Sequence, residues 1–266
     1  MTTSSRVPGL LWFIVAVLSL VVALVGVAAP SVYGGLISDV IAPGVFAQDM
    51  VAIAASLFLL FLSFKNRTFE LRRNVLASGL LVFFFYAYGV YAIERIYNWL
   101  YPLYLAILGL SLFTLIHTVA DTSRKASDLR VRASVRHIGA ACSLFVAVAF
   151  TGIWLSQLVP LIQAGDRIEY TYAIYILDIA FIMPAFVIAA IMSLRQRPLG
   201  LAAVPSLFVA GAGILSPLAL AEILKPLSYG AAMDMGTFWL FLVLSLAFLV
   251  LAVVYLRALR HTADPA

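Results

Sequence analysis

Residues 171–194 read TYAIYILDIAFIMPAFVIAAIMSL and contain one charged side chain, the carboxylate of Asp178. A helix of about 20 apolar residues crosses a bilayer, so this run predicts a membrane-spanning helix. An ionisable group at bilayer depth costs roughly 2.5–3.5 kcal/mol on insertion scales, and such groups usually line a cavity, pair with a neighbour or carry a proton. The stretch therefore predicts the fold class and one candidate functional residue.

The composition of the whole chain is that of a membrane protein. Its 266 residues are 64% apolar and 11% charged, and the mean hydropathy is +1.09. Soluble domains average about 45–50% apolar and about 25% charged residues. The apolar runs predict an all-α membrane protein, a single polytopic domain over residues 1–266 with eight transmembrane helices. We place these helices at 8–29, 49–64, 74–93, 99–118, 137–162, 171–194, 199–220 and 236–256.

The basic residues predict which way the chain crosses the membrane. If the N-terminus is inside, all of the 17 Lys and Arg residues except Arg95, Arg167 and Lys225 fall in cytoplasmic segments. Short loops rich in Lys and Arg stay in the cytoplasm. We therefore expect both termini on the cytoplasmic side, together with the loops at 65–73, 121–136 and 195–198.

The order of certain polar residues and prolines indicates an internal repeat. Several of them recur at a nearly constant spacing of about 130 residues: Pro30 with Pro160, Asp49 with Asp178, Ser63 with Ser193 and Arg67 with Arg197. This pattern predicts a four-plus-four duplication with halves at 8–120 and 137–258. Because four is even, both halves would share one orientation, with a pseudo-twofold axis along the membrane normal. The alternative is chance matching between apolar sequences.

Polar side chains gather around Asp178 at the outer ends of the predicted helices. Asp178 lies about two turns inside its helix, and Tyr175 shares its helical face. Asp49 and Gln48 begin the second predicted helix at the same level. We expect these groups to line a hydrated, outward-facing cavity. The candidate ligand- or proton-binding residues are Asp178, Asp49, Gln48, Tyr175, Tyr88, Tyr91, Tyr104 and Glu94.

Structural interpretations of the same residues stay open. Tyrosines form belts at membrane interfaces in proteins of every function. Asp49 would cap the second predicted helix, and Asp178 would be a structural group if it met a tyrosine. The connection at 30–48, broken by Pro43 and Gly44, is expected to form a partly ordered outer lid or interfacial segment. Prolines inside helices leave a carbonyl without its usual donor and suit either a cavity or ordinary packing. These prolines are Pro184, Pro205 and Pro217.

Several chemistries are disfavoured. The single cysteine, Cys142, excludes an internal disulfide and Cys-based metal sites. The three histidines lie at predicted cytoplasmic ends or in the tail, far from the outer acids, which disfavours a haem, a metal centre or a Ser-His-Asp arrangement. The basic residues form no patch with interleaved aromatics, so we expect no nucleic-acid partner. We expect no metal and no cofactor, and the lipid bilayer as the main partner.

Three segments resemble a family. APGVFAQD at 42–49, FFYAYGVYA at 84–92 and ILDIAFIMPA at 176–185 look like a widespread bacterial family of multi-pass membrane proteins without an assigned activity. The resemblance covers the whole chain. It implies a protein of the bacterial plasma membrane and no particular reaction.

Two functions from different classes fit these features. The first is a small transporter or ligand-binding membrane protein, in which a small molecule or protons engage Asp178 and its neighbours from outside; the repeat and the prolines favour it. The second is a membrane enzyme or complex subunit that acts on a lipid, quinone or isoprenoid, with the acids as general acid and base. A carboxylate-only site without a metal motif weakens the enzyme interpretation. An accessory helix bundle without a ligand is the remaining alternative.

Overall fold

The structure is a computed structural model that describes residues 7–64, 70–125, 129–168 and 171–261. Eight helices in these residues are long and apolar enough to cross a membrane, which confirms the predicted number. They are α1 (Val7–Ala28), α2 (Ala42–Phe64), α3 (Glu70–Ile93), α4 (Tyr101–Lys125), α5 (Ala133–Ala164), a sixth made of α6 (Tyr172–Leu177), the π-helical turn η3 (Asp178–Ile182) and α7 (Met183–Leu194), then α8 (Pro198–Ser228) and α9 (Met235–Ala258).

The second helix begins earlier than predicted, at Ala42 instead of 49. The sequence suggested a break at Pro43 and Gly44. However, a proline in the first turn of a helix is well tolerated, because its missing N–H would have no intrahelical partner there. Asp49 therefore lies about two turns inside α2, and its interpretation as a helix cap is wrong. The connection before α2 is correspondingly shorter, and it contains one 3₁₀ turn, η1 (Pro30–Tyr33).

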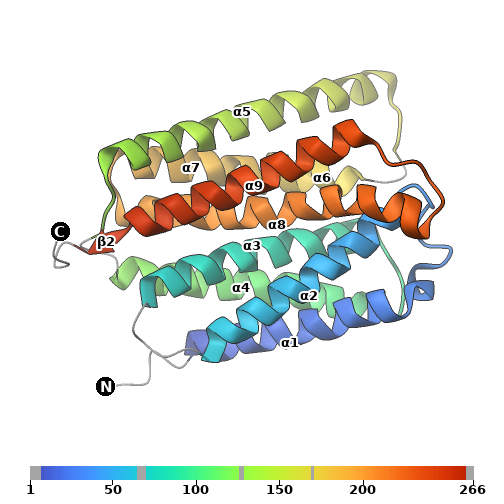
Figure 1. Cartoon of the computed structure of the whole chain (residues 1–266), viewed down its shortest axis with the longest axis horizontal. Coiled ribbons are helices and arrows are strands. Elements are labelled where there is room, and N and C mark those ends of the chain that lie inside the picture. The colour runs from blue at the N-terminus through green and yellow to red at the C-terminus, as the bar shows by residue number, and fades with distance from the viewer. Residues whose placement is uncertain (1–6, 65–69, 126–128, 169–170, 262–266) are drawn as a thin grey trace.

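Helices α3 and α8 form the centre of the bundle (Figure 1). In α3, 83% of the residues of the apolar window are buried, against 22% in α5 and 17% in α9, so the last two helices lie at the periphery. Helix α3 packs against α4 in its own half of the chain and against α8 in the other. Large apolar side chains form one cluster within α1–α4 and a second that joins α3 to the later helices.

The contact between α3 and α8 depends on a glycine. A Cβ atom on Gly79 would lie 2.6 Å from the carbonyl oxygen of Ser206, so a larger residue would push the helices apart. Across the same contact, the Ser206 hydroxyl donates to the carbonyl of Val75 at 2.9 Å. Small residues that allow close backbone approach are typical of helix packing in membranes. The two halves of the chain are therefore joined by close packing.

Helix α8 continues through three prolines, Pro205, Pro217 and Pro226. Proline leaves the carbonyl four residues earlier without its usual donor, and a serine hydroxyl can replace that donor. The Ser216 hydroxyl donates to the carbonyl of Gly213 at 3.2 Å, which is the carbonyl that Pro217 leaves open. This hydrogen bond helps to explain how one long helix spans Pro198–Ser228.

The start of α1 and the end of α9 lie at the same end of the bundle (Figure 1). There β1 (Leu129–Arg130), before α5, pairs antiparallel with β2 (Arg260–His261), after α9. Two residues per strand carry no periodic pattern, and the sequence did not predict this ladder. It ties the last segment of the described chain to the connection between the two halves.

Candidate functional site

Four acidic side chains within the long apolar helices are buried. Their exposed fractions are 1% for Asp49, 7% for Asp121, 6% for Asp178 and 4% for Glu222. A buried ionisable group requires hydrogen-bonding partners, because an unpartnered polar atom in an apolar environment is costly. The partners of each acid therefore show which of them are fixed by the packing.

Asp49 is held by two tyrosines. The Tyr33 hydroxyl donates to its Oδ2 atom at 2.5 Å, and the Tyr91 hydroxyl donates to Oδ1 at 3.0 Å. Helix α1 leaves room for the carboxyl group only because residue 26 is glycine: a Cβ there would overlap the Asp49 side chain. Asp49 is therefore enclosed by α1, η1 and α3.

The other tyrosines of this region pack around the same carboxyl group. We call Tyr33, Asp49, Tyr88, Tyr91 and Tyr104 the Asp49 cluster. The rings of Tyr91 and Tyr104 are 5.1 Å apart, and those of Tyr88 and Tyr91 are 5.9 Å apart. Tyr88 donates to the Ser19 carbonyl at 3.0 Å, and Tyr104 accepts from the Asn98 amide at 3.0 Å. Each polar group of the cluster has a partner in the protein, and the rings belong to an apolar core.

Asp178 has different surroundings, because it is the first residue of the π-helical turn η3. Pro184 follows this turn and has no N–H to donate, which favours a departure from regular α-helical bonding. The Asp178 carboxyl group accepts a hydrogen bond from the Trp154 indole at 2.7 Å. The phenol of Tyr86 on α3 lies near the same carboxyl group. Single π-helical turns inside α-helices occur frequently at functional sites.

A groove of about 610 Å³ lies beside this turn, between the end of α5 and the start of α6. We call it the α5–α6 groove. Its wall includes Ile179 and Ala180, the two residues that follow Asp178 in η3. Much of the remaining wall is apolar, while charged and phenolic side chains also contribute to it. These polar lining residues are Asp166, Arg167, Tyr172 and Tyr175.

Tyr175 is close to Asp178 but is not its direct partner. The Tyr175 hydroxyl donates to the Gln157 amide oxygen at 2.9 Å, and its ring meets the Trp154 ring edge-on with centroids 5.6 Å apart. Trp154 therefore lies between the two predicted residues. Trp154 was not among the predicted site residues. The sequence indicates only in general terms that a buried carboxylate needs donors and that tryptophan supplies one N–H.

Gln48 and Glu94, two further predicted residues, make contacts with the backbone. The Gln48 amide donates to the Ala87 carbonyl at 3.1 Å. Glu94, at the end of α3, accepts the backbone N–H of Ala173 at 2.8 Å and so satisfies a free donor in the first turn of α6. Burial raises the pKa of Glu94, and the backbone N–H of Ala173 opposes that shift. Both side chains connect helices.

The predicted site residues therefore separate into two groups. Asp49 and its tyrosines occupy one side of α3, and Asp178 meets Tyr86 on another, because Tyr86 and Tyr91 are five residues apart and point in different directions from the helix. Asp49 and Asp178 share no hydrogen-bonding partner among the described residues. Only Asp178 and Tyr175 belong to the surroundings of the α5–α6 groove.

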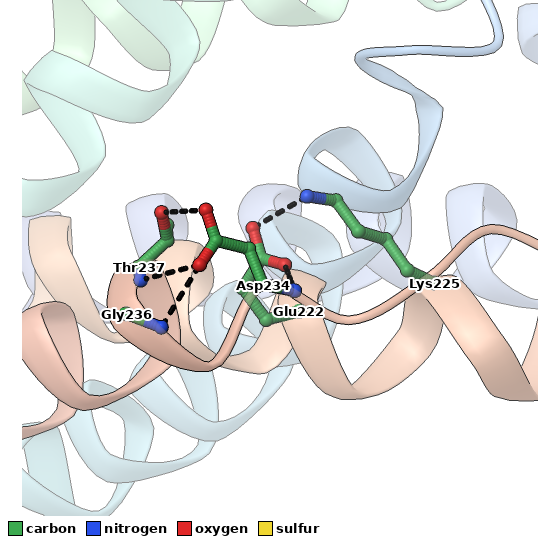
Figure 2. A network of polar contacts seen from close by, with 5 residues as sticks. All are labelled: Glu222, Lys225, Asp234, Gly236 and Thr237. Atoms are coloured by element: carbon green, nitrogen blue, oxygen red, sulfur yellow. Dashed lines mark hydrogen bonds and ion pairs between the residues drawn. The ribbon is translucent and has the colours of Figure 1, made fainter.

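Two further buried acids were not predicted as site residues. Asp121 accepts the Asn74 amide at 3.1 Å near the opposite end of the bundle. Glu222 lies at the corner between α8 and α9, where it pairs with Lys225 at 2.6 Å and accepts the backbone N–H of Asp234 (Figure 2). Asp234 in turn caps α9, and the hydrogen bonds from Thr237 hold the pKa of its carboxyl group below the usual range. This corner is a structural connection.

Comparisons of the chain with protein-family models, curated proteins and solved structures give no match. In the described part of the chain, no three His, Cys, Asp or Glu side chains are grouped closely enough to hold a metal ion. The resemblance to a bacterial membrane family stays a prediction.

Proposed function

We propose that this chain is an integral protein of a bacterial plasma membrane that binds and transports a small molecule through the α5–α6 groove. The observation that carries the proposal is the place of Asp178: it begins a π-helical turn whose next two residues line that groove. A ligand in the groove contacts this turn directly. The hydrogen bond that Asp178 accepts from Trp154 is then the contact that ligand binding alters.

The π-helical turn supplies a mechanism for such a response. A π turn contains one residue more than regular α-helix, and one residue corresponds to about 100° of rotation around a helix axis. A shift of the turn along the helix would move Asp178 relative to Trp154 and change the groove wall at Ile179. Non-regular backbone at membrane depth is typical where a helix lines a substrate cavity.

We further propose that the groove faces the outside of the cell. Its support is the uneven distribution of charge. Arg95 follows α3, Arg167 follows α5 and Lys225 lies near the end of α8, all at the helix ends near the groove, whereas most of the arginines lie at the opposite helix ends. Both termini are then cytoplasmic. Ligand would enter the α5–α6 groove from the outer surface.

A four-plus-four duplication belongs to the same proposal. Helix α1 packs on α2 as α5 packs on α7, and α3 packs on α4 as α8 packs on α9. Between the halves α3 meets α8, while α2 contacts α8 and α6 contacts α3. A pseudo-twofold axis would relate these contacts in pairs. Transporters are commonly built from two such repeats.

A second candidate is a membrane enzyme or complex subunit that acts on a lipid, quinone or isoprenoid. The apolar wall of the groove, with Leu158, Leu161 and Ile162, favours this alternative, because it would hold a long hydrocarbon chain. A cysteine at Ala180, in a Cys142→Ser background, distinguishes the two. A transporter exposes that cysteine to impermeant maleimide from each side of the membrane in turn, whereas an enzyme pocket exposes it from one side only.

The main test uses two matched variants, Asp178→Asn and Asp49→Asn. Purified protein is screened by thermal unfolding against small amines, organic acids and short-chain quinones. A ligand at about 100 times its Kd stabilises a protein by about 2.7 kcal/mol, which is a measurable shift. We expect compounds that stabilise the wild type to lose this effect in Asp178→Asn and keep it in Asp49→Asn. Stabilisation that is equal in all three proteins would contradict the proposal.

A further inference from the structure

A second cavity, of about 280 Å³, lies between α3, α4, α7 and α8. Its lining includes Val75 near the start of α3, Thr122 near the end of α4, Met192 near the end of α7 and Leu199 near the start of α8. These helix ends meet at the basic end of the bundle. The cavity shares no lining residue with the α5–α6 groove, so it is a separate site.

The surface of this cavity offers little to a polar ligand. Most of its lining residues are aliphatic. The hydroxyl of Ser206 donates to backbone carbonyls at 2.9 and 3.0 Å, and that of Thr122 donates to the Thr118 carbonyl at 2.7 Å. Apolar cavities of this kind exclude water and accept hydrocarbon. The chemistry of the lining therefore fits an alkyl chain.

Positive charge stands next to the cavity. The turn between α7 and α8 carries Arg195 and Arg197, both exposed, a few residues from the lining residues Met192 and Leu199. Exposed Arg124 follows Thr122 on α4 by two residues. Among the described residues, none of these three arginines forms an ion pair. Their guanidinium groups are available to an anion that lies over the cavity.

The backbone of the α7–α8 turn, which carries Arg195 and Arg197, is held by its own contacts. The backbone N–H of Arg197 donates to the Met192 carbonyl at 2.9 Å, and Gln196 adopts a left-handed conformation with φ of 55°. Gly200 permits the close approach of α8, because a Cβ there would overlap the backbone near Met192. The turn therefore connects an apolar wall and a basic rim without a flexible segment between them.

We infer that this cavity binds one acyl chain of an anionic phospholipid, whose phosphate lies against Arg195, Arg197 and Arg124. The inference rests on the proposed orientation, which places this end of the bundle in the cytoplasm, but not on transport through the α5–α6 groove, because it concerns other residues at the other end of the bundle. Basic pockets between helices on the cytoplasmic side are typical sites for anionic lipid head groups, and that leaflet is rich in such lipids. Guanidinium groups bind phosphate in a bidentate manner.

The test measures retained lipid by native mass spectrometry, with palmitoyl-oleoyl phosphatidylglycerol and phosphatidylcholine as probes. We expect one phosphatidylglycerol per wild-type chain, bound at least several-fold more tightly than phosphatidylcholine. Arg195→Gln combined with Arg197→Gln should abolish this preference. Ala203→Leu, which fills part of the cavity, should weaken binding of both lipids. Glycerol phosphate, which has the head group without a chain, should not compete.

The matched control is Arg257→Gln combined with Arg260→Gln, which removes the same charge from exposed positions outside the cavity. It should keep the wild-type preference. If the control loses the preference as strongly as the first pair, binding reflects general attraction to a basic surface and the inference is wrong. Unchanged lipid binding in Ala203→Leu, or competition by glycerol phosphate, would also overturn it. Size-exclusion profiles of all variants check that they remain folded.

Discussion

Asp49 and Asp178 each lie in the second membrane-spanning helix of their half of the chain, but the two acids are held in different ways. Asp49 belongs to a continuous α-helix, and two phenol hydroxyls bind its two oxygens. Asp178 begins a π-helical turn, and the α5–α6 groove lies directly beyond it. Helix α1 closes over Asp49 at Gly26, whereas α5, which carries the Trp154 partner of Asp178, is largely exposed.

The difference shows that a buried acid in a membrane helix is not by itself a site. Both carboxyl groups satisfy their hydrogen-bonding needs within the protein. Of the two, only Asp178 also lies in an irregular stretch of backbone with the α5–α6 groove beside it. The α5–α6 groove lies beside the turn that Asp178 begins, whereas Asp49 is enclosed by α1, η1 and α3. Asp49 is therefore fixed within a packed core, and Asp178 is the acid beside a groove.

The largest effect is expected from Gly26→Ala. The new methyl group overlaps the Asp49 carboxyl group and the Tyr33 hydroxyl. Overpacking costs about 1–3 kcal/mol, and a disturbed buried hydrogen bond adds about 1–3 kcal/mol. We expect a clear loss of stability in thermal unfolding in detergent. Gly152→Ala is the control, because nothing lies near a Cβ at that position. Equal melting temperatures for the two variants would show that the Asp49 cluster is loosely packed.

A smaller contrast is expected between Tyr91→Phe and Trp154→Phe. Tyr91→Phe removes a donor from an enclosed carboxylate and should cost about 1–3 kcal/mol in unfolding free energy. Trp154→Phe removes the indole donor of Asp178, and water from the adjacent groove can replace it, so we expect less than about 1 kcal/mol. Tyr175→Phe is the reference variant, because the hydrogen bond that it removes is exposed to the surroundings and should contribute little to the unfolding free energy. A larger loss of unfolding free energy in Trp154→Phe than in Tyr91→Phe would contradict the difference drawn between Asp49 and Asp178.

The smallest effect is a pH dependence at two helix ends, where Glu94 follows α3 and Asp234 precedes α9. Burial raises the pKa of Glu94, so protonation adds stability that is fully present below the ordinary value of 4.5 and is lost as pH rises through the raised pKa. The Thr237 hydrogen bonds lower the pKa of Asp234, so its contribution is present above the ordinary 3.8 and is lost as pH falls through the lowered pKa. Melting temperatures of Glu94→Gln and Asp234→Asn, relative to wild type across pH, should therefore change in opposite directions. If the melting-temperature differences of the two variants changed with pH in the same direction, the opposite pKa shifts of Glu94 and Asp234 would be contradicted.

The sequence was sufficient for the eight long helices, because length and apolarity alone determine them. It was not sufficient for the start of α2, where Pro43 was interpreted as a break although a first-turn proline continues into a helix. Asp178 was predicted as an intramembrane acid, but its partners Trp154 and Tyr86 belong to other helices. Which donor reaches a carboxylate depends on how those helices pack, and periodicity within one helix does not contain that information.

The two-residue ladder between β1 and β2 has a consequence for biosynthesis. Leu129 pairs with His261, roughly 130 residues later in the chain. At about 5–20 residues per second, the second strand is made on the order of ten seconds after the first. The connection between the halves therefore leaves the ribosome without its partner and waits while four more helices enter the membrane. Pairing can occur only after α9 has been made, so the ladder closes later than the synthesis of the eight long helices.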